Sequence, residues 1–198
     1  MKNLESFIKT DPENISIKQK AWDDIKQNIL KSASEFENEK MEEGVMDTVV
    51  VMNLLGVNTM ESCEGHVEKE KPYPSVIFGS KKHSQFYSKE SNEINTKYRN
   101  VKGDSPEYRE LLESIKEESS NLKNKVQILL DEFYSGKEWS PYHYGVSVFT
   151  KDSMYSLAPV GLENAENNSI ENKRTILDLS RKEMDDLTEF LKNKYFKE

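Results

Sequence analysis

The chain has 198 residues, of which 35% are hydrophobic and 32% are charged, and its 28 basic and 36 acidic side chains give a net charge of −8 at pH 7. This length suits one domain with a full core, and nine Tyr and eight Phe argue against disorder. The acidic balance disfavours nucleic acid as a partner, and the single cysteine excludes an internal disulfide framework.

The N-terminal residues and the apolar runs predict where the protein resides. Charges are spread through the first fourteen residues, which lack the apolar region of a secretory signal. The longest apolar run, Val49 to Met52, is far too short to span a bilayer. Together with the single cysteine, which suits a reducing compartment, these features predict a cytoplasmic protein with no membrane partner.

Two helices are predicted early in the chain, after a flexible arm over residues 1–14. The first covers residues 17–39 and carries an apolar stripe at near-helical spacing, which consists of Trp22, Ile25, Ile29, Ala33 and Phe36. The second covers residues 44–55 and ends at Gly56, as is typical of a left-handed helix C-terminus. It is almost wholly apolar, so we expect it to be buried, although three consecutive valines also suit a strand.

A strand, a turn and a second strand are predicted next. Residues 57–62 form the strand that delivers Cys63 to a turn at Gly65, and residues 75–78 form the second strand. Residues 80–104 then carry an excess of basic side chains with aromatic ones between them. We expect a long, partly irregular basic excursion, because long segments of this kind in compact domains are often functional.

The helix over residues 105–135 is the best marked element of the chain. It begins at Ser105-Pro106-Glu107, which supplies a cap, a proline in the first turn and an acidic residue. Its apolar stripe suits packing along the first helix or against a second copy of the chain. The second arrangement would make the protein a homo-oligomer.

The remaining residues predict three strands and one more helix. Residues 144–150 and 154–160 form a hairpin, 163–172 a polar loop and 174–179 another strand. The last helix begins at Ser180, where Glu183 follows at capping-box spacing. The predicted fold class is therefore α+β, with one domain over residues 1–198 and an antiparallel or mixed sheet of about five strands packed against four helices.

The stretch with Cys63, Glu64 and His66 contains more potentially reactive side chains than any other stretch of the chain. A Cys-x-x-His spacing places a thiolate and an imidazole around one turn, and zinc binds both at about 2.0–2.3 Å. A metal held by Cys63 and His66 would need further ligands, for which the chain offers His143, His83, Asp47 or a water molecule.

Besides metal binding, two catalytic roles fit the same turn. Cys63 suits a nucleophile whose thiol is activated by His66, with Glu64 or Asp47 orienting the imidazole. Alternatively, Glu64 and His66 act as acid and base, and Cys63 is packed in the core as most single cysteines are. The sequence leaves these roles open.

Five further residues are candidates for binding a substrate. Asp47 and Asn53 are the polar exceptions in the second helix, and a buried amide needs partners, so Asn53 is expected to support the Cys63 turn. Lys81 and Lys82 open the basic excursion and suit an anionic group. His143 stands at the start of a predicted strand and is the best remote partner for Cys63.

The stretch from Gly44 to Pro74 resembles a group of uncharacterised bacterial and phage proteins. The likeness rests on an apolar helix followed by Thr59-x-x-Ser62-Cys63-Glu64-Gly65-His66. More distantly, Ser62-Cys63-Glu64-Gly65 is similar to the Ser-Cys-Ser-Gly-Arg strand end of the tRNA wybutosine-synthesising protein 3 family, with Glu64 and His66 in place of Ser and Arg. That second resemblance implies methyl transfer on tRNA.

These observations lead to two main functional hypotheses, and to a third that the net charge disfavours, nucleic-acid binding or modification through the basic excursion. In the first, the protein is a hydrolase or transferase with Cys63, Glu64 and His66 in its active site, acting on a small anionic or nucleotide-like molecule beside the basic excursion. In the second, it is a non-catalytic binding protein whose Cys-Glu-Gly-His turn is structural or clips a zinc ion.

Overall fold

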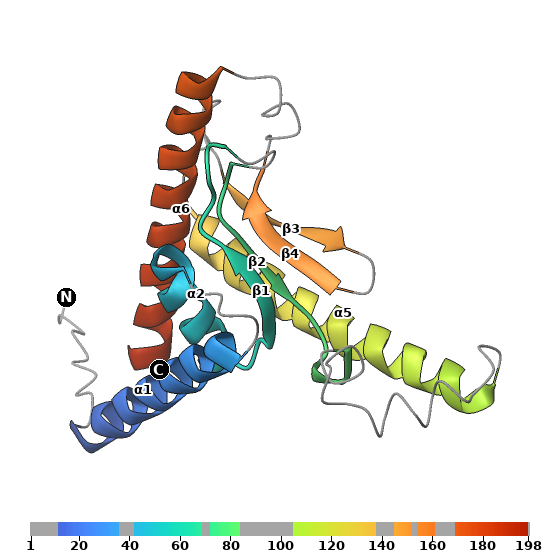
Figure 1. The fold of residues 1–198 in the computed structure, drawn as a ribbon. Coiled ribbons are helices and arrows are strands. Elements are labelled where there is room, and N and C mark those ends of the chain that lie inside the picture. Colours follow the sequence, from blue (N-terminus) through green and yellow to red (C-terminus); the bar gives the residue numbers. More distant parts are fainter. Residues whose placement is uncertain are drawn as a thin grey trace, which may run out of the picture.

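The computed structural model describes residues 12–35, 42–68, 72–83, 105–137, 145–151, 154–160 and 169–197. Within them the elements follow in the order α1 (Pro12–Glu35), α2 (Glu43–Leu54), β1 (Thr59–Cys63), β2 (Ser75–Phe78), α5 (Pro106–Tyr134), β3 (Val146–Lys151), β4 (Met154–Pro159) and α6 (Ile170–Lys197) (Figure 1). Residues 81–83 add one short helical turn to the four helices that were expected. The fold is α+β, as predicted.

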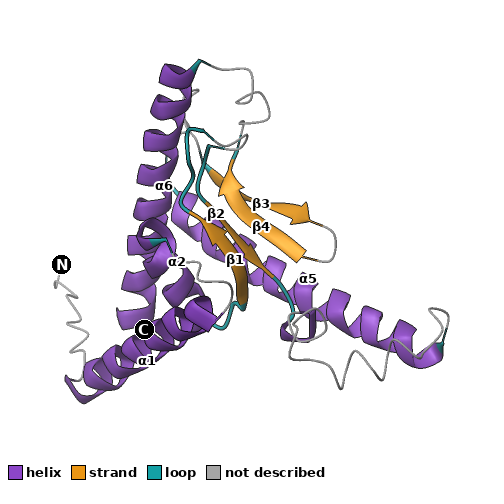
Figure 2. Cartoon of the chain, in the orientation of Figure 1, coloured by secondary structure: helices purple, strands orange, loops and turns teal. Residues whose placement is uncertain are grey.

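The strands form one antiparallel sheet in the order β1-β2-β4-β3 (Figure 2). Val76, Leu157 and Val148 lie opposite one another across β2, β4 and β3, so their side chains share a face. This face carries the core, because Val76 and Leu157 are buried. The strands predicted at residues 57–62, 75–78, 144–150 and 154–160 are present as β1 to β4, with bounds that differ by up to two residues.

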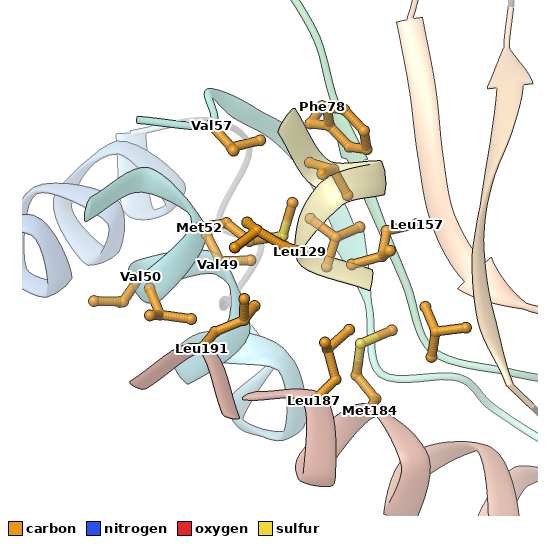
Figure 3. Packing of buried hydrophobic residues seen from close by; sticks show 14 of the residues in the cluster. Val49, Val50, Met52, Val57, Phe78, Leu129, Leu157, Met184, Leu187 and Leu191 are labelled. Carbon is orange, nitrogen blue, oxygen red and sulfur yellow. The ribbon is translucent and has the colours of Figure 1, made fainter. Parts of the chain in front are cut away.

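Helix α2 lies at the centre of the core, as its apolar composition predicts. Its side chains pack with those of α5, α6 and the sheet (Figure 3). Val50 and Val51 are fully buried, and Gly56 closes the helix with a φ of 74°. A void of about 10 Å³ between α2, α5 and α6 is lined only by apolar side chains, so it is a packing defect of the core.

Helix α6 begins earlier than expected and replaces a predicted strand. Residues 174–179 are helical, so the expected count of about five strands is wrong, and four strands are present among the described residues. The start of the helix is capped by Ser169, whose hydroxyl accepts from the backbone N–H of Asn172. Ser180 and Glu183 are buried inside the helix, so they do not form the predicted cap. The buried side chains recur at helical spacing from Ile176 to Leu191.

Helix α1 also begins earlier than predicted. Pro12 and Glu13 provide a proline and an acidic residue in its first turn, so residues 12–14 belong to the helix and not to an arm. Residues 1–11 and 36–39 lie outside the described residues, as do 84–104 of the predicted basic excursion.

Helix α5 matches the boundaries predicted for the helix over residues 105–135. Ser105 caps it by accepting the backbone N–H of Tyr108, and Gly136 follows its end with a φ of 79°. Its stripe packs on β3, β4 and α6, and α1 instead packs on α2. Among the described helices, none combines the length and the apolar character that crossing a bilayer requires.

Candidate functional site

The Cys-Glu-Gly-His turn follows directly from strand β1. Cys63 is the last residue of β1, an edge strand of the sheet, and it pairs with Ser75 of β2. Gly65 makes the turn with a φ of 81°, a conformation that L side chains rarely adopt. A Cβ atom there would lie 2.6 Å from the carbonyl carbon of Tyr73 and 2.7 Å from Leu177. Only glycine therefore lets the chain turn back this closely.

Glu42 completes the site from a distant part of the sequence. It immediately precedes α2, and its Oε1 lies 2.6 Å from Nε2 of His66. Its Oε2 accepts the backbone N–H of Glu64 at 2.5 Å. Sequence reasoning missed Glu42, because no pattern distinguishes it from the acidic residues around it. The one signal that could have found it is its place at the start of the helix that leads into the turn.

The sulfur of Cys63, a ring nitrogen of His66 and a carboxylate oxygen of Glu42 all lie within 4.8 Å of one another. Among the described residues, this is the one group of three or more cysteine, histidine or acidic side chains placed to share a metal ion. The backbone N–H of Gly65 points to the sulfur at 3.4 Å. The side chains of His66 and Glu42 remain 25% and 28% exposed, so solvent reaches the group.

Glu64 is held in place by its neighbours and does not point into this group. Its Oε2 accepts the backbone N–H of Gly44 at 3.0 Å, at the N-terminus of α2. Its Oε1 lies 3.6 Å from the guanidinium of Arg181 on α6. A Cβ at position 44 would lie 2.7 Å from Oε2 of Glu64, so a larger residue there would displace this carboxylate. The carboxylate therefore joins the turn to two helices.

Arg181 was not predicted, and it binds the backbone of the turn at two points. Its Nε donates to the carbonyl of Glu64 and its Nη2 donates to the carbonyl of Gly65, both at 2.9 Å. No local signal in the sequence marks it, because Arg181 lies more than a hundred residues from the turn and in a segment expected to begin a helix.

The structure places three of the predicted substrate-binding residues, Asn53, Lys81 and Lys82, away from Cys63. Asn53 donates to Oγ1 of Thr59, the first residue of β1, so it supports the far end of the strand and not the Cys63 turn. Lys81 and Lys82 follow the end of β2 that pairs with Thr59, also away from Cys63. Asp47 forms ion pairs with Lys26 and Lys192 that join α2 to α1 and α6.

Of the two other histidines, His83 lies away from the site and His143 lies outside the described residues. His83 follows the far end of β2 with the lysines and is buried, and desolvation lowers the pKa of its imidazole. Of the predicted site residues, the structure thus brings together Cys63 and His66, and it adds Glu42.

No protein-family model matches the chain, and no curated protein or solved structure is significantly similar to it. The residues of the site are therefore the basis for inferring a function.

Proposed function

We propose that this chain is a small metal-dependent hydrolase that binds a zinc-class divalent ion with Glu42, Cys63 and His66. One observation carries this proposal, the compact triangle of sulfur, nitrogen and oxygen within 4.8 Å. Thiolate, imidazole and carboxylate are the three side-chain groups that zinc binds in proteins, at about 2.0–2.3 Å. In tetrahedral geometry such ligands lie roughly 3.5 Å apart, a spacing between the 2.6 Å of the Glu42–His66 contact and the 4.8 Å limit of the group.

The same distances argue against a cysteine, histidine and glutamate triad. In a triad the imidazole lies between its partners, because the nucleophile and the acid contact different ring nitrogens. Two hydrogen bonds of about 3 Å on opposite sides of the ring hold the outer atoms roughly 7 Å apart. The sulfur of Cys63 and the carboxylate of Glu42 are closer than this. Such proximity suits ligands that share one ion.

Three protein ligands and solvent access are the features of a catalytic zinc site, because the fourth position is left for water. The ion would supply a water molecule whose pKa is lowered to about 7. The chain supplies the ligands and their orientation: Gly65 allows the turn, and Glu42 approaches from the start of α2. A thiolate ligand also suits the reducing cytoplasm in which we place the protein.

The runner-up is a thiol enzyme, either a hydrolase or a transferase, with Cys63 as nucleophile. It is favoured by the N–H of Gly65 directed at the sulfur and by the imidazole of His66 within 4.8 Å of that sulfur, as a nucleophile and base without a third member. A small anionic or nucleotide-like substrate remains our proposal for either enzyme. It rests on the basic composition of residues 80–104 alone, because Lys81 and Lys82 lie away from Cys63 and residues 84–104 lie outside the described residues.

Metal binding is tested first, by titrating the metal-free protein with zinc against a chromogenic chelator. We expect one ion per chain, and a thiolate-to-metal charge-transfer band when Co²⁺ replaces zinc. Cys63→Ala and Glu42→Gln should each weaken binding more than tenfold, because each removes a ligand. Glu43→Gln is the matched control, since Glu43 is the exposed neighbour of Glu42. Absence of the cobalt band in the parent protein would refute the metal site.

Hydrolysis is tested with p-nitrophenyl acetate and bis(p-nitrophenyl) phosphate on the zinc-loaded protein. Turnover that requires zinc and is lost in Glu42→Gln supports the proposal. Turnover that needs Cys63 but persists after chelation identifies the thiol enzyme instead. Stoichiometric zinc with no turnover of either probe favours the non-catalytic clip.

A further inference from the structure

We infer that Arg181 is the positioning residue of the candidate metal centre and acts through the backbone of Glu64 and Gly65. This inference rests on the proposed function, because it concerns how the ligands of that site are held. The two residues between Cys63 and His66 are the two whose carbonyls Arg181 binds. Their conformation decides whether the sulfur and the imidazole face the same point.

The guanidinium matches this task in its geometry. Successive carbonyls of an extended chain point to opposite sides, whereas those of Glu64 and Gly65 both accept from one side chain at 2.9 Å. The positive φ of Gly65 makes this arrangement accessible. A guanidinium presents its donors in a fixed planar fork, so it binds two neighbouring carbonyls at once. A lysine would bring the charge but not the fork.

The contact extends to Glu42 through Glu64. The N–H of Glu64 donates to the carboxylate of Glu42, and the side chain of Glu64 bonds to the N-terminus of α2. Holding Glu64 therefore fixes the turn and the helix start together, which carry all three ligands. Arg181 links this assembly to α6, and Figure 1 shows the segment that directly follows β1 beside that helix.

The ion pair with Glu64 contributes little to this effect. The side chain of Arg181 is 40% exposed, its separation from the carboxylate is 3.6 Å, and exposed ion pairs of this kind stabilise a protein little. The two bonds to carbonyls are shorter and better directed, and a guanidinium donor makes them charge-assisted. We therefore expect the fork of Arg181, and not its charge, to control the site.

The test compares Arg181→Lys and Arg181→Ala with Lys182→Ala, which removes the exposed neighbouring charge on the same helix. Both Arg181 variants should lose about 10–100-fold in zinc affinity, the range for residues that orient metal ligands, and Lys182→Ala should lose less than about twofold. Methylguanidinium at concentrations too low to denature should restore part of the affinity of Arg181→Ala. It should not restore Glu42→Gln. Circular dichroism establishes that each variant is folded.

A second readout needs no metal. The pH profile of Cys63 alkylation by iodoacetamide reports how the sulfur is placed, and it should shift in both Arg181 variants but not in Lys182→Ala. If the parent protein binds no zinc, the proposed function fails while this profile still tests the positioning role. Affinity in Arg181→Lys equal to that of the parent, or an unchanged alkylation profile in both variants, would overturn the inference.

Discussion

Gly65 is the residue on which the geometry of the site most depends. Two constraints meet there, a backbone conformation that favours glycine and a space that leaves no room for a Cβ. Gly136, at the end of α5, has almost the same φ of 79°, but no described atom lies within 4 Å of the position that a Cβ would take. Comparing the two glycines therefore separates the cost of the conformation from the cost of the overlap.

We expect Gly136→Ala to lower the free energy of unfolding by about 1 kcal/mol, the cost of a left-handed conformation in an L residue. Gly65→Ala should cost about 3 kcal/mol or more, because overlap with the backbone of Tyr73 adds to that strain. Urea unfolding measures both values. Equal losses in the two variants would show that the turn relaxes around the added methyl group.

The sequence predicts the site residues that are close together in the chain, and it misses those that are distant in sequence. Cys63 and His66 are visible because two ligand types stand three residues apart around a glycine. Glu42 and Arg181 are not, because they reach the turn through tertiary contacts that span 22 to 117 residues. Asn53 was expected to support the Cys63 turn. It supports Thr59 instead, because the end of α2 lies beside the start of β1 and Cys63 is at the other end of that strand.

At the level of elements, boundaries with strong local chemistry were predicted well. The Ser105-Pro106 start of α5 and the Gly56 end of α2 are confirmed. The predicted strand over residues 174–179 is wrong because its adjacent apolar residues Ile176 and Leu177 fit the core face of a helix, which continues through Met184. The single domain and the homo-oligomer stay predictions.

Helices α2 and α6 are joined inside the core by a pair of hydroxyl groups. The Oγ1 atoms of Thr48 and Thr188 lie 2.7 Å apart, and both residues are buried. The hydroxyl of Thr188 donates to the carbonyl of Met184. Thr48 must therefore be the donor in the pair, so the two hydroxyls are not equivalent.

Thr188→Val should destabilise the protein more than Thr48→Val, by about 1 kcal/mol. In Thr188→Val the hydroxyl of Thr48 loses its acceptor, whereas in Thr48→Val the hydroxyl of Thr188 keeps Met184. An unsatisfied buried donor costs about 1–3 kcal/mol. The double variant should cost less than the sum, because neither hydroxyl then remains. Denaturant unfolding of the three variants measures this, and strict additivity would contradict the assignment of the donor.

On the scale of the whole molecule, the candidate metal centre connects parts of the chain that are far apart in sequence. Its ligands come from the residue before α2, from the end of β1 and from the turn after β1, and this turn is bonded to α6. An ion bound there would bridge residues that lie close together only in the native state. Ligands that bind the native state alone raise its stability by mass action.

Zinc in excess should therefore raise the melting temperature of the parent protein. At free zinc about 100-fold above its Kd the gain is about 2.7 kcal/mol, which corresponds to about 5–10 °C for a chain of this size. The gain should shrink in acid, where protons compete for the ligands. Each variant is compared with and without zinc, so that differences in its intrinsic stability cancel. Glu42→Gln and Cys63→Ala should show little increase in melting temperature, and Glu43→Gln should show the full increase. An equal gain in all of them would place the ion elsewhere, because no ligand of the proposed site would then be needed to hold it.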